Sequence, residues 1–307
     1  MTHCIKKLKY LQNNKARLRK RAGLISALRT YFNEHNFIEV ETPIVIKAPA
    51  PEEYIEGIPV ENGFLRTSPE LQMKEMLCAG YEKIYQIGTC FRKNEFGARH
   101  RPEFTMLEWY ETEINYLQLL EFTADLLRSA AQKTIGSTRI EYQGQAIDLS
   151  LAPQIITVRD AYKKYADVDV DKIAAEEDFD KIMTSQIEPY LGIGQMTFLI
   201  DYPARRAALA RLKPGNPEVA ERWELYLAGM EIANAYGELN DPVEQRKRFE
   251  EARVVRAENN FIPYPFPDDF FQALESGMPE CSGCALGVDR LAMIFTDSAD
   301  IADIKIF

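Results

Sequence analysis

Residues 103–110 read Glu103-Phe104-Thr105-Met106-Leu107-Glu108-Trp109-Tyr110, a partly aromatic run that is typical of a β-strand. Side chains of a strand point alternately to opposite faces, so the even-numbered residues place an aromatic ring, a carboxylate and a phenol on one face. A second β-prone run, residues 83–92, ends in Phe91-Arg92, and a polar loop separates the two. Arg92 therefore points a planar cation, suited to clamping phosphate, into a cleft above the two strands. The alternative is a half-buried hairpin in which Glu108 pairs with a neighbour.

Outward from this hairpin, strands outnumber β-α-β units. Strands are expected at 37–43, 83–92, 103–111, 138–150 (a hairpin), 197–201, 207–212, 222–236 and 281–286. Helices are expected at 21–35, 67–79, 117–131, 157–165, 241–259, 268–276 and 288–295, the second of them opened by a capping box of Thr67 and Glu70. The expected fold class is α+β, an antiparallel sheet flanked by helices. No linker divides the chain, so residues 1–307 are expected to form one domain, with a helical insertion at about 167–190.

Composition excludes several classes of protein. The 307 residues are 46% hydrophobic and 27% charged, which is ordinary globular usage. The sequence shows neither an apolar run of ~18 residues nor a secretory leader, so no membrane partner is expected. Five cysteines, an odd number in a chain of this size, indicate a reducing, cytoplasmic location. A net charge of −10 argues against sequence-independent nucleic-acid binding.

The charge is unevenly distributed. No acidic residue precedes Glu34, whereas nine lysines and arginines lie between Lys6 and Arg29. This basic segment is interpreted either as the solvated face of a leading helix or as a surface that docks an acidic partner.

Two further stretches carry candidate chemistry. Residues 231–241 place Glu231 and Glu238 before a turn, and carboxylate oxygens suit Mg²⁺ shared with phosphates or an ammonium group. The alternative is ordinary turn chemistry. Residues 283–290 read Gly-Cys-Ala-Leu-Gly-Val-Asp-Arg; their small side chains let the backbone approach a ligand, and Arg290 adds charge to a helix start that favours anions. The alternative is tight packing with a surface arginine.

In order and spacing, these stretches resemble the motifs of class II aminoacyl-tRNA synthetases. Val40-Glu41-Thr42-Pro43 is similar to motif 1, which forms the dimer interface in that family, so a homodimer is expected. Phe91 through Glu108 is similar to motif 2, and Gly287-Val288-Asp289-Arg290 to motif 3. Ser68-Pro69-Glu70-Leu71, residues 103–110 and residues 237–241 resemble lysyl-tRNA synthetases more closely. The resemblance implies the class II catalytic core.

A finer resemblance is to the elongation factor P–(R)-β-lysine ligase family, short paralogues of the lysyl-tRNA synthetases. It rests on Glu108-Trp109-Tyr110 and on residues 279–287, where Ala285 replaces the glycine usual in synthetases. Motif 1 lies before residue 44, so no anticodon-binding domain is expected.

The resemblance implies ATP-dependent activation of (R)-β-lysine or lysine as an adenylate. The acyl group then passes to a lysine ε-amino group of elongation factor P, and tRNA is not the expected acceptor. Two alternatives stay open: a stand-alone lysine-activating enzyme that acts on tRNA or a small molecule, and a non-catalytic regulatory paralogue. Retention of Arg92 and Arg290 argues against the second.

The resemblance also implies a role for each matched residue. On the substrate side, Ser68 and Glu70 face its amino end, Glu108, Tyr110 and Glu238 surround its distal ammonium, and Ala285 shapes the pocket near its backbone. On the ATP side, Arg92 binds the α-phosphate, Phe104 stacks on adenine, Arg290 holds the γ-phosphate against Gly287, and Glu231 coordinates Mg²⁺ beside Ile232. Arg92 and Arg290 are the expected catalytic residues. The loop departs from the family pattern, with Asn94 where glutamate is usual and Arg101 where asparagine is frequent, and both are expected near ATP.

Overall fold

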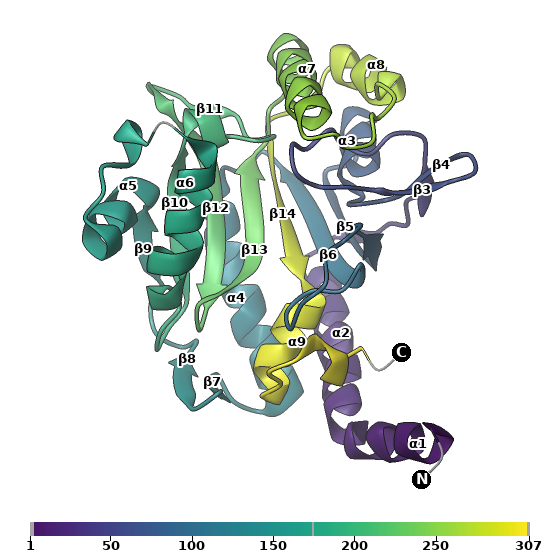
Figure 1. Ribbon diagram of the computed structural model, residues 1–307, viewed down its shortest axis with the longest axis vertical. Helices are drawn as coiled ribbons and strands as arrows, with labels where there is room; N and C mark the ends of the chain where they lie inside the picture. Colours follow the sequence, from purple (N-terminus) through teal and green to yellow (C-terminus); the bar gives the residue numbers. More distant parts are fainter. Residues whose placement is uncertain (1–2, 174, 306–307) are drawn as a thin grey trace.

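A computed structural model describes residues 3–173 and 175–305 of the chain, and its centre is one large sheet (Figure 1). The strand order is β1-β5-β6-β14-β13-β12-β10-β9, and β11 (Leu212–Lys213) pairs with β12. The six inner strands are β5 (Lys83–Phe91), β6 (Glu103–Thr112), β14 (Cys281–Gly287), β13 (Met230–Gly237), β12 (Asn216–Leu227) and β10 (Thr197–Pro203). All neighbours among these six are antiparallel. Only the margins differ, because β1 (Ile38–Glu39) runs parallel to β5 and β9 (Gln154–Thr157) parallel to β10. The expected α+β class is confirmed, with a sheet that is mixed at its two edges.

One face of the sheet carries the main hydrophobic core. The helices α2 (Lys15–Glu34), α4 (Tyr116–Ile135) and α9 (Val288–Thr296) pack together against it. From β6, Leu107 and Trp109 point into this core and are fully buried. Their even-numbered neighbours therefore face the opposite side, which confirms the alternation predicted for this strand.

The basic N-terminal segment begins with α1 (His3–Asn13), which extends away from the sheet (Figure 1), and continues into α2. Arg21 of α2 donates hydrogen bonds to Asp289 of α9 and to Thr105 of β6, both at 2.8 Å. Arg21 therefore stabilises the fold, because its guanidinium pairs with Asp289 inside the protein instead of facing a partner. The side chains of Lys6 and Lys7 lie outside the described part of the structure, so the docking interpretation stays a prediction.

The other face is framed at two ends. At one end, α3 (Glu70–Cys78), α7 (Pro242–Glu258) and α8 (Asp268–Ser276) lie beside a small sheet of β2 (Val45–Ile46), β4 (Gly63–Leu65) and β3 (Ile58–Val60). At the other end, α5 (Val158–Ala161), α6 (Glu176–Ile182) and short helical turns up to Tyr190 form a separate apolar cluster with β10 and β12. The expected insertion at 167–190 falls within this cluster. Between the two ends, the middle of the sheet is left accessible.

Several local expectations are confirmed. The hairpin expected at 138–150 forms from β7 (Arg139–Tyr142) and β8 (Gln145–Asp148), and it turns at Gln143 and Gly144, both with positive φ. Asp241 caps α7 by accepting a hydrogen bond from the Val243 N–H, as the Asp-Pro start of that helix predicts.

Three local expectations are wrong. Helix α3 has no capping box: the Glu70 N–H donates to Ser68 Oγ at 2.9 Å, and the Glu70 carboxylate pairs with Lys74 instead of returning to Thr67. The run 222–236 is not continuous, because a turn at Ala228 and Gly229 divides it into β12 and β13. In 207–212 only Leu212 is in a strand, because the preceding residues turn across the sheet edge.

Within the described residues, no helix combines the length and the apolar character that a membrane span requires.

Candidate active site

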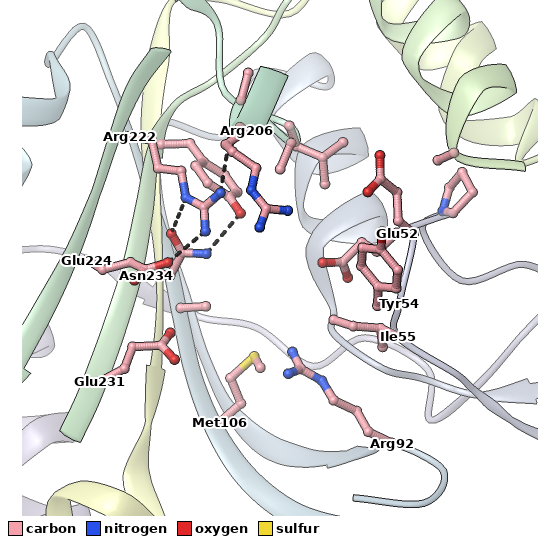
Figure 2. A pocket seen from close by; sticks show the side chains of 18 of the residues that line it. Glu52, Tyr54, Ile55, Arg92, Met106, Arg206, Arg222, Glu224, Glu231 and Asn234 are labelled. Carbon is pink, nitrogen blue, oxygen red and sulfur yellow. Dashed lines mark hydrogen bonds and ion pairs between the residues drawn. The ribbon is translucent and has the colours of Figure 1, made fainter. Parts of the chain in front are cut away.

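A cavity of about 670 Å³ opens on the accessible face of the sheet. Its floor comes from β6, β12, β13 and β14, and its rim from the loop after β5, residues 51–55, residues 204–209 and part of α7. Figure 2 shows Arg222, Glu224, Asn234 and Glu231 along one side of it and Glu52, Tyr54 and Ile55 along the other. A volume of this size suits a nucleotide or a similar small ligand.

The strand register aligns the floor. Ala285 of β14 lies opposite Glu108 on one side and opposite Asn234 on the other. Two residues further along β14, Gly287 lies opposite Met106 of β6. Because these positions are two residues apart on each strand, they all face the cavity side of the sheet.

The end of the cavity nearest α9 is cationic. The Arg92 guanidinium lies 5.2 Å from the centre of the Phe104 ring. Arg290, in the first turn of α9, donates hydrogen bonds to the Glu231 carbonyl at 2.9 Å and to its carboxylate at 3.1 Å, and contacts His100 Nε2. Burial, together with Arg290 and Arg92, lowers the pKa of His100 to about 4. His100 is therefore neutral at pH 7 and accepts from Arg290, which leaves the arginines as the local positive charges for a polyanion.

Two carboxylates face the cationic end from the neighbouring strands. Glu231 lies on β13, and Glu224 on β12 accepts hydrogen bonds from Arg222 at 2.7 Å and from the Tyr226 hydroxyl at 2.6 Å. Partial burial and the nearby Glu224 raise the pKa of Glu231. Two carboxylates that lie close together in one cavity are suited to a shared cation.

These two carboxylates also fit Mg²⁺. In the described part of the chain no three histidine, cysteine or acidic side chains gather as an all-protein metal centre would require. Mg²⁺ bound together with phosphates needs only one or two carboxylates, so the pair fits that type of site. Glu231 is predicted from the sequence, whereas Glu224 is not. The sequence does contain a spacing that could have indicated Glu224. Glu224 and Glu231 are seven residues apart, as are Glu231 and Glu238, and the β12–β13 turn lies between the first two.

The residues predicted to bind the amino acid converge beside the cavity, on the same face of the sheet. Glu108 accepts hydrogen bonds from the Tyr110 hydroxyl at 2.6 Å and from Ser68 Oγ at 3.1 Å. Lys74 Nζ, fully buried, lies 2.6 Å from both Glu70 Oε1 and Glu238 Oε2. Ser68, Glu70, Glu108, Tyr110 and Glu238 thus form one buried network, which does not line the open cavity.

This network has three carboxylates and one internal cation, Lys74. Burial and the neighbouring Glu70 raise the pKa of Glu108 to about 8. Burial also raises the pKa of Glu238 to about 7, against the opposing effect of Lys74. Burial alone would lower the pKa of Lys74, but Glu238 and Glu70 raise it well above its usual value, so Lys74 stays charged. The surplus of carboxylates can accept one more ammonium group.

Lys74 is a member of this network that was not predicted from the sequence. It lies one helical turn after Glu70, a spacing that allows an ion pair on a helix, but its pairing with Glu238 could not be inferred from spacing. The close packing of the network also explains Gly283, because a Cβ there would overlap the Tyr110 ring.

The structure places most of the predicted nucleotide residues in the cavity wall. These are Arg92, Arg101, Phe104, Glu231, Ile232, Gly287 and Arg290, together with Ala285. Arg101 is held by the Gly97 carbonyl at 2.7 Å and by Asp300 at 3.3 Å. Asn94 is not brought to the wall: its side chain donates to Glu56 at 3.3 Å. The roles assigned to these residues stay predictions.

Comparison with known proteins agrees with this geometry. Residues 5–307 match the family described as tRNA synthetases class II (D, K and N). The chain belongs to this family.

Two relatives are lysine–tRNA ligases. The ligase of Moorella thermoacetica is 35% identical over 313 aligned residues, which cover 94% of this chain and 64% of the ligase. The ligase of Dechloromonas aromatica is 36% identical over 313 residues, and the alignment covers 94% of this chain and 62% of the ligase. This class II chain therefore spans a little under two thirds of the length of these relatives.

Proposed function

We propose that this class II synthetase chain activates a lysine-type amino acid with ATP and Mg²⁺ as an aminoacyl-adenylate. The observation that carries the proposal is that a cationic cluster and an acidic cluster lie next to each other on the same face of the sheet. Arg92 and Arg290 form the cationic end of the cavity, and Glu108 and Glu238 belong to the buried acidic network beside it. An amino acid with a carboxylate at one end and an ammonium at the other matches this arrangement.

The charge of the acidic network selects among the three amino acids of the family. Aspartate would bring a carboxylate toward Glu70, Glu108 and Glu238, and its desolvated charge would find no free cation there, because Lys74 is already paired twice. Asparagine would leave the surplus acidic charge uncompensated. A lysine side chain supplies the missing ammonium, and the lysine–tRNA ligase relatives are named for the same amino acid.

The first chemical step follows from the cationic end. A carboxylate oxygen of the substrate attacks the α-phosphorus of ATP, the bond from that phosphorus to the bridging oxygen breaks, and pyrophosphate leaves. Arg92 and Arg290 stabilise the phosphate charge and align the reactants, which is most of what such a transfer needs. Mg²⁺, when held with the phosphates by Glu224 and Glu231, supplies further charge neutralisation.

The finer proposal concerns the acceptor. The amine nitrogen of a lysine on elongation factor P attacks the acyl carbon of the adenylate, AMP leaves, and the nitrogen loses a proton to give an amide. The proposal rests on Glu108-Trp109-Tyr110 and on Ala285, which resemble the elongation factor P–(R)-β-lysine ligases. This finer proposal makes (R)-β-lysine the preferred substrate. The Ala285 methyl group, which replaces a glycine usual in synthetases, lies on the floor between Glu108 and Asn234 and would shape the pocket near the substrate backbone.

A homodimer is part of the same proposal. Strand β1 forms an edge of the large sheet, and the residues near it are unusually exposed for apolar side chains: Ile38 at 54%, Ile44 at 45% and Val45 at 48%. An exposed apolar edge strand tends to pair with another chain, and a second copy of this chain would bury it. Sedimentation velocity should give a mass of twice 35.2 kDa, and a monomer at micromolar concentration would contradict the dimer.

The deciding experiment is ATP–pyrophosphate exchange with (R)-β-lysine, lysine and aspartate, followed by transfer to elongation factor P or to lysine tRNA. We expect exchange strongest with (R)-β-lysine, none with aspartate, and labelling of elongation factor P alone. Stronger exchange with lysine and charging of tRNA would favour the stand-alone activator. No exchange with any of the three would overturn the proposal and favour the regulatory paralogue.

A further inference from the structure

The loop between β5 and β6, residues 92–102, carries Arg92 and His100 at the cationic end of the cavity. The same loop contains the two departures from the family pattern, Asn94 and Arg101. In the structure, each of these two side chains binds an acidic residue outside the loop. The two departures therefore fasten the loop to the rest of the protein.

The first end of the loop is fastened to the segment before β3. The Lys93 N–H donates a hydrogen bond to the Glu56 carbonyl at 2.8 Å. The Glu56 carboxylate accepts from Asn94 Nδ2 at 3.3 Å and pairs with Lys93 Nζ at 3.5 Å. The Glu56 side chain is only 13% exposed, so these contacts are partly shielded from solvent.

The backbone at Asn94 explains why asparagine occupies this position. Its φ of 65° lies in the left-handed region, which asparagine adopts more readily than most residues that have a side chain. A glutamate, which is usual here in the family, would strain the same turn. Asparagine thus stabilises the turn and also supplies the amide group that reaches Glu56.

The second end of the loop is fastened to the short turn after α9, beside which the loop lies in Figure 1. The Ile301 N–H donates to the Ala98 carbonyl at 2.7 Å, and Asp300 accepts from Arg101 at 3.3 Å. Because His100 lies between Ala98 and Arg101, these two bonds fix the backbone on either side of it.

The fastened loop carries groups that face the phosphates in the proposed reaction. The Arg92 N–H donates to the Pro102 carbonyl at 2.8 Å and closes the base of the loop. His100 contacts Arg290 of α9. All of these bonds are made within the protein, so no contact with ATP is needed to form them.

We propose that Asn94 and Arg101 are positioning residues, which hold the β5–β6 loop in the conformation that binds ATP. Their partners, Glu56 and Asp300, belong to the same device. The device acts on the triphosphate through the loop, and Arg101 is not itself a contact of ATP. This inference rests on the proposed function, and it gives a physical reason for the two departures from the family pattern.

The partners provide the test, because Glu56 and Asp300 both lie outside the cavity wall. Glu56→Gln and Asp300→Asn each keep an acceptor oxygen and remove the charge. ATP–pyrophosphate exchange with lysine should show the KM for ATP raised about two- to fivefold in each variant, as for a partly exposed ion pair. The kcat and the KM for lysine should stay within about 1.5-fold, because only ATP binding has to restore the loop conformation.

The two tethers share no partner, so their effects should multiply. The variant that carries both substitutions should raise the KM for ATP about four- to 25-fold. Asp125→Asn is the matched control, because Asp125 forms a surface ion pair with Arg128 at 2.7 Å on α4, against the opposite face of the sheet. It should behave as the unchanged chain.

Arg101→Asn distinguishes a tether from a ligand contact. A raised KM for ATP in Arg101→Asn, together with an unchanged KM in Asp300→Asn, would make Arg101 a direct contact of ATP and overturn the proposal. Equal losses of kcat and of the KM for lysine would indicate general damage to the fold and would also overturn it.

Hydrogen exchange of the loop amides, measured without ATP, gives a readout that does not depend on catalysis. Residues 93–101 should exchange faster in Glu56→Gln and Asp300→Asn than in the unchanged chain, because local opening becomes easier. Absence of pyrophosphate exchange in the unchanged chain would overturn the proposed function. Faster amide exchange in the variants would then still support the tethers, and unchanged amide exchange would overturn them.

Discussion

The two halves of the site handle charge in opposite ways. In the nucleotide half, Arg290 and Glu231 form an ion pair at 3.1 Å with side chains that are 23% and 36% exposed, open to the cavity. In the amino-acid half, Lys74 and Glu238 form one at 2.6 Å with side chains that are 0% and 1% exposed. The first pair can exchange its partners for a ligand at little desolvation cost, whereas the second has its charges locked inside the protein.

This difference indicates how each half recognises its ligand. A nucleotide carries several charges and can be bound by arginines that reorient when it arrives. A single ammonium group is a smaller signal, and it is distinguished best by buried carboxylates that outnumber the one internal cation, Lys74. In the proposed function, selectivity for the amino acid would therefore belong to the buried network, and catalysis to the open cavity.

Lys74→Met should give the largest effect, because it leaves Glu70 and Glu238 buried without their cation. We expect the free energy of unfolding to fall by about 3–5 kcal/mol in urea titrations. Lys47→Met is the control: Lys47 pairs with Asp269 on the surface, with side chains 84% and 67% exposed, and its removal should change stability little. Equal stability of the two variants would show that the buried pair is not a structural requirement.

Arg290→Ala tests the open half. Loss of one cation that stabilises the developing phosphate charge should reduce kcat of exchange about 10²- to 10³-fold, with stability nearly unchanged. Arg253→Ala, which removes a surface arginine of α7 paired with Glu250, should have no effect on exchange. If Arg290→Ala lost stability and kept its rate, the division of labour between the halves would be reversed.

The pH dependence of stability tests the raised pKa of Glu108. Its pKa is about 8 in the folded protein and near 4.5 when exposed, so the native state holds the proton that the unfolded chain loses. Its contribution to stability is complete below about pH 4.5 and is lost as the pH rises toward 8, by at most about 1.4 kcal/mol per pH unit. Glu108→Gln cannot lose this proton, so unfolding measured from pH 5 to 8.5 should show the variant gaining stability relative to the unchanged chain. Parallel curves would mean that Glu108 is ionised in the folded protein.

Ala285→Gly should give the smallest effect. Removing one methyl group from the floor is worth about 0.8 kcal/mol and should shift the kcat/KM ratio several-fold from (R)-β-lysine toward lysine. Ala146→Gly, at an exposed position of β8, is the control for a lost methyl group and should leave the ratio unchanged. A ratio unaffected by Ala285→Gly would remove this position from substrate choice.

The sequence alone determined what depends on local pattern. Alternation in residues 103–110 placed Glu108 and Tyr110 on the face opposite Leu107 and Trp109, because strand geometry repeats every two residues. The Asp241-Pro242 start of α7 and the Gln143-Gly144 turn followed from equally local chemistry. The division of the run 222–236 was missed, because its turn at Ala228 and Gly229 interrupts an otherwise continuous β pattern.

Only the tertiary structure decided which distant charges meet. Lys74 reaches Glu238, and Arg256 anchors the loop of Glu52 across 204 residues of sequence, through packing that no local spacing encodes. The strand order brings β14 between β6 and β13, and so places Ala285 between Glu108 and Asn234. Periodicity states which face a side chain takes, but the partner it finds there depends on how the strands and helices assemble. For that reason most members of the candidate site could be predicted from the sequence, whereas Glu224 and Lys74 were not predicted, and the fold alone divided the site into an open half and a buried one.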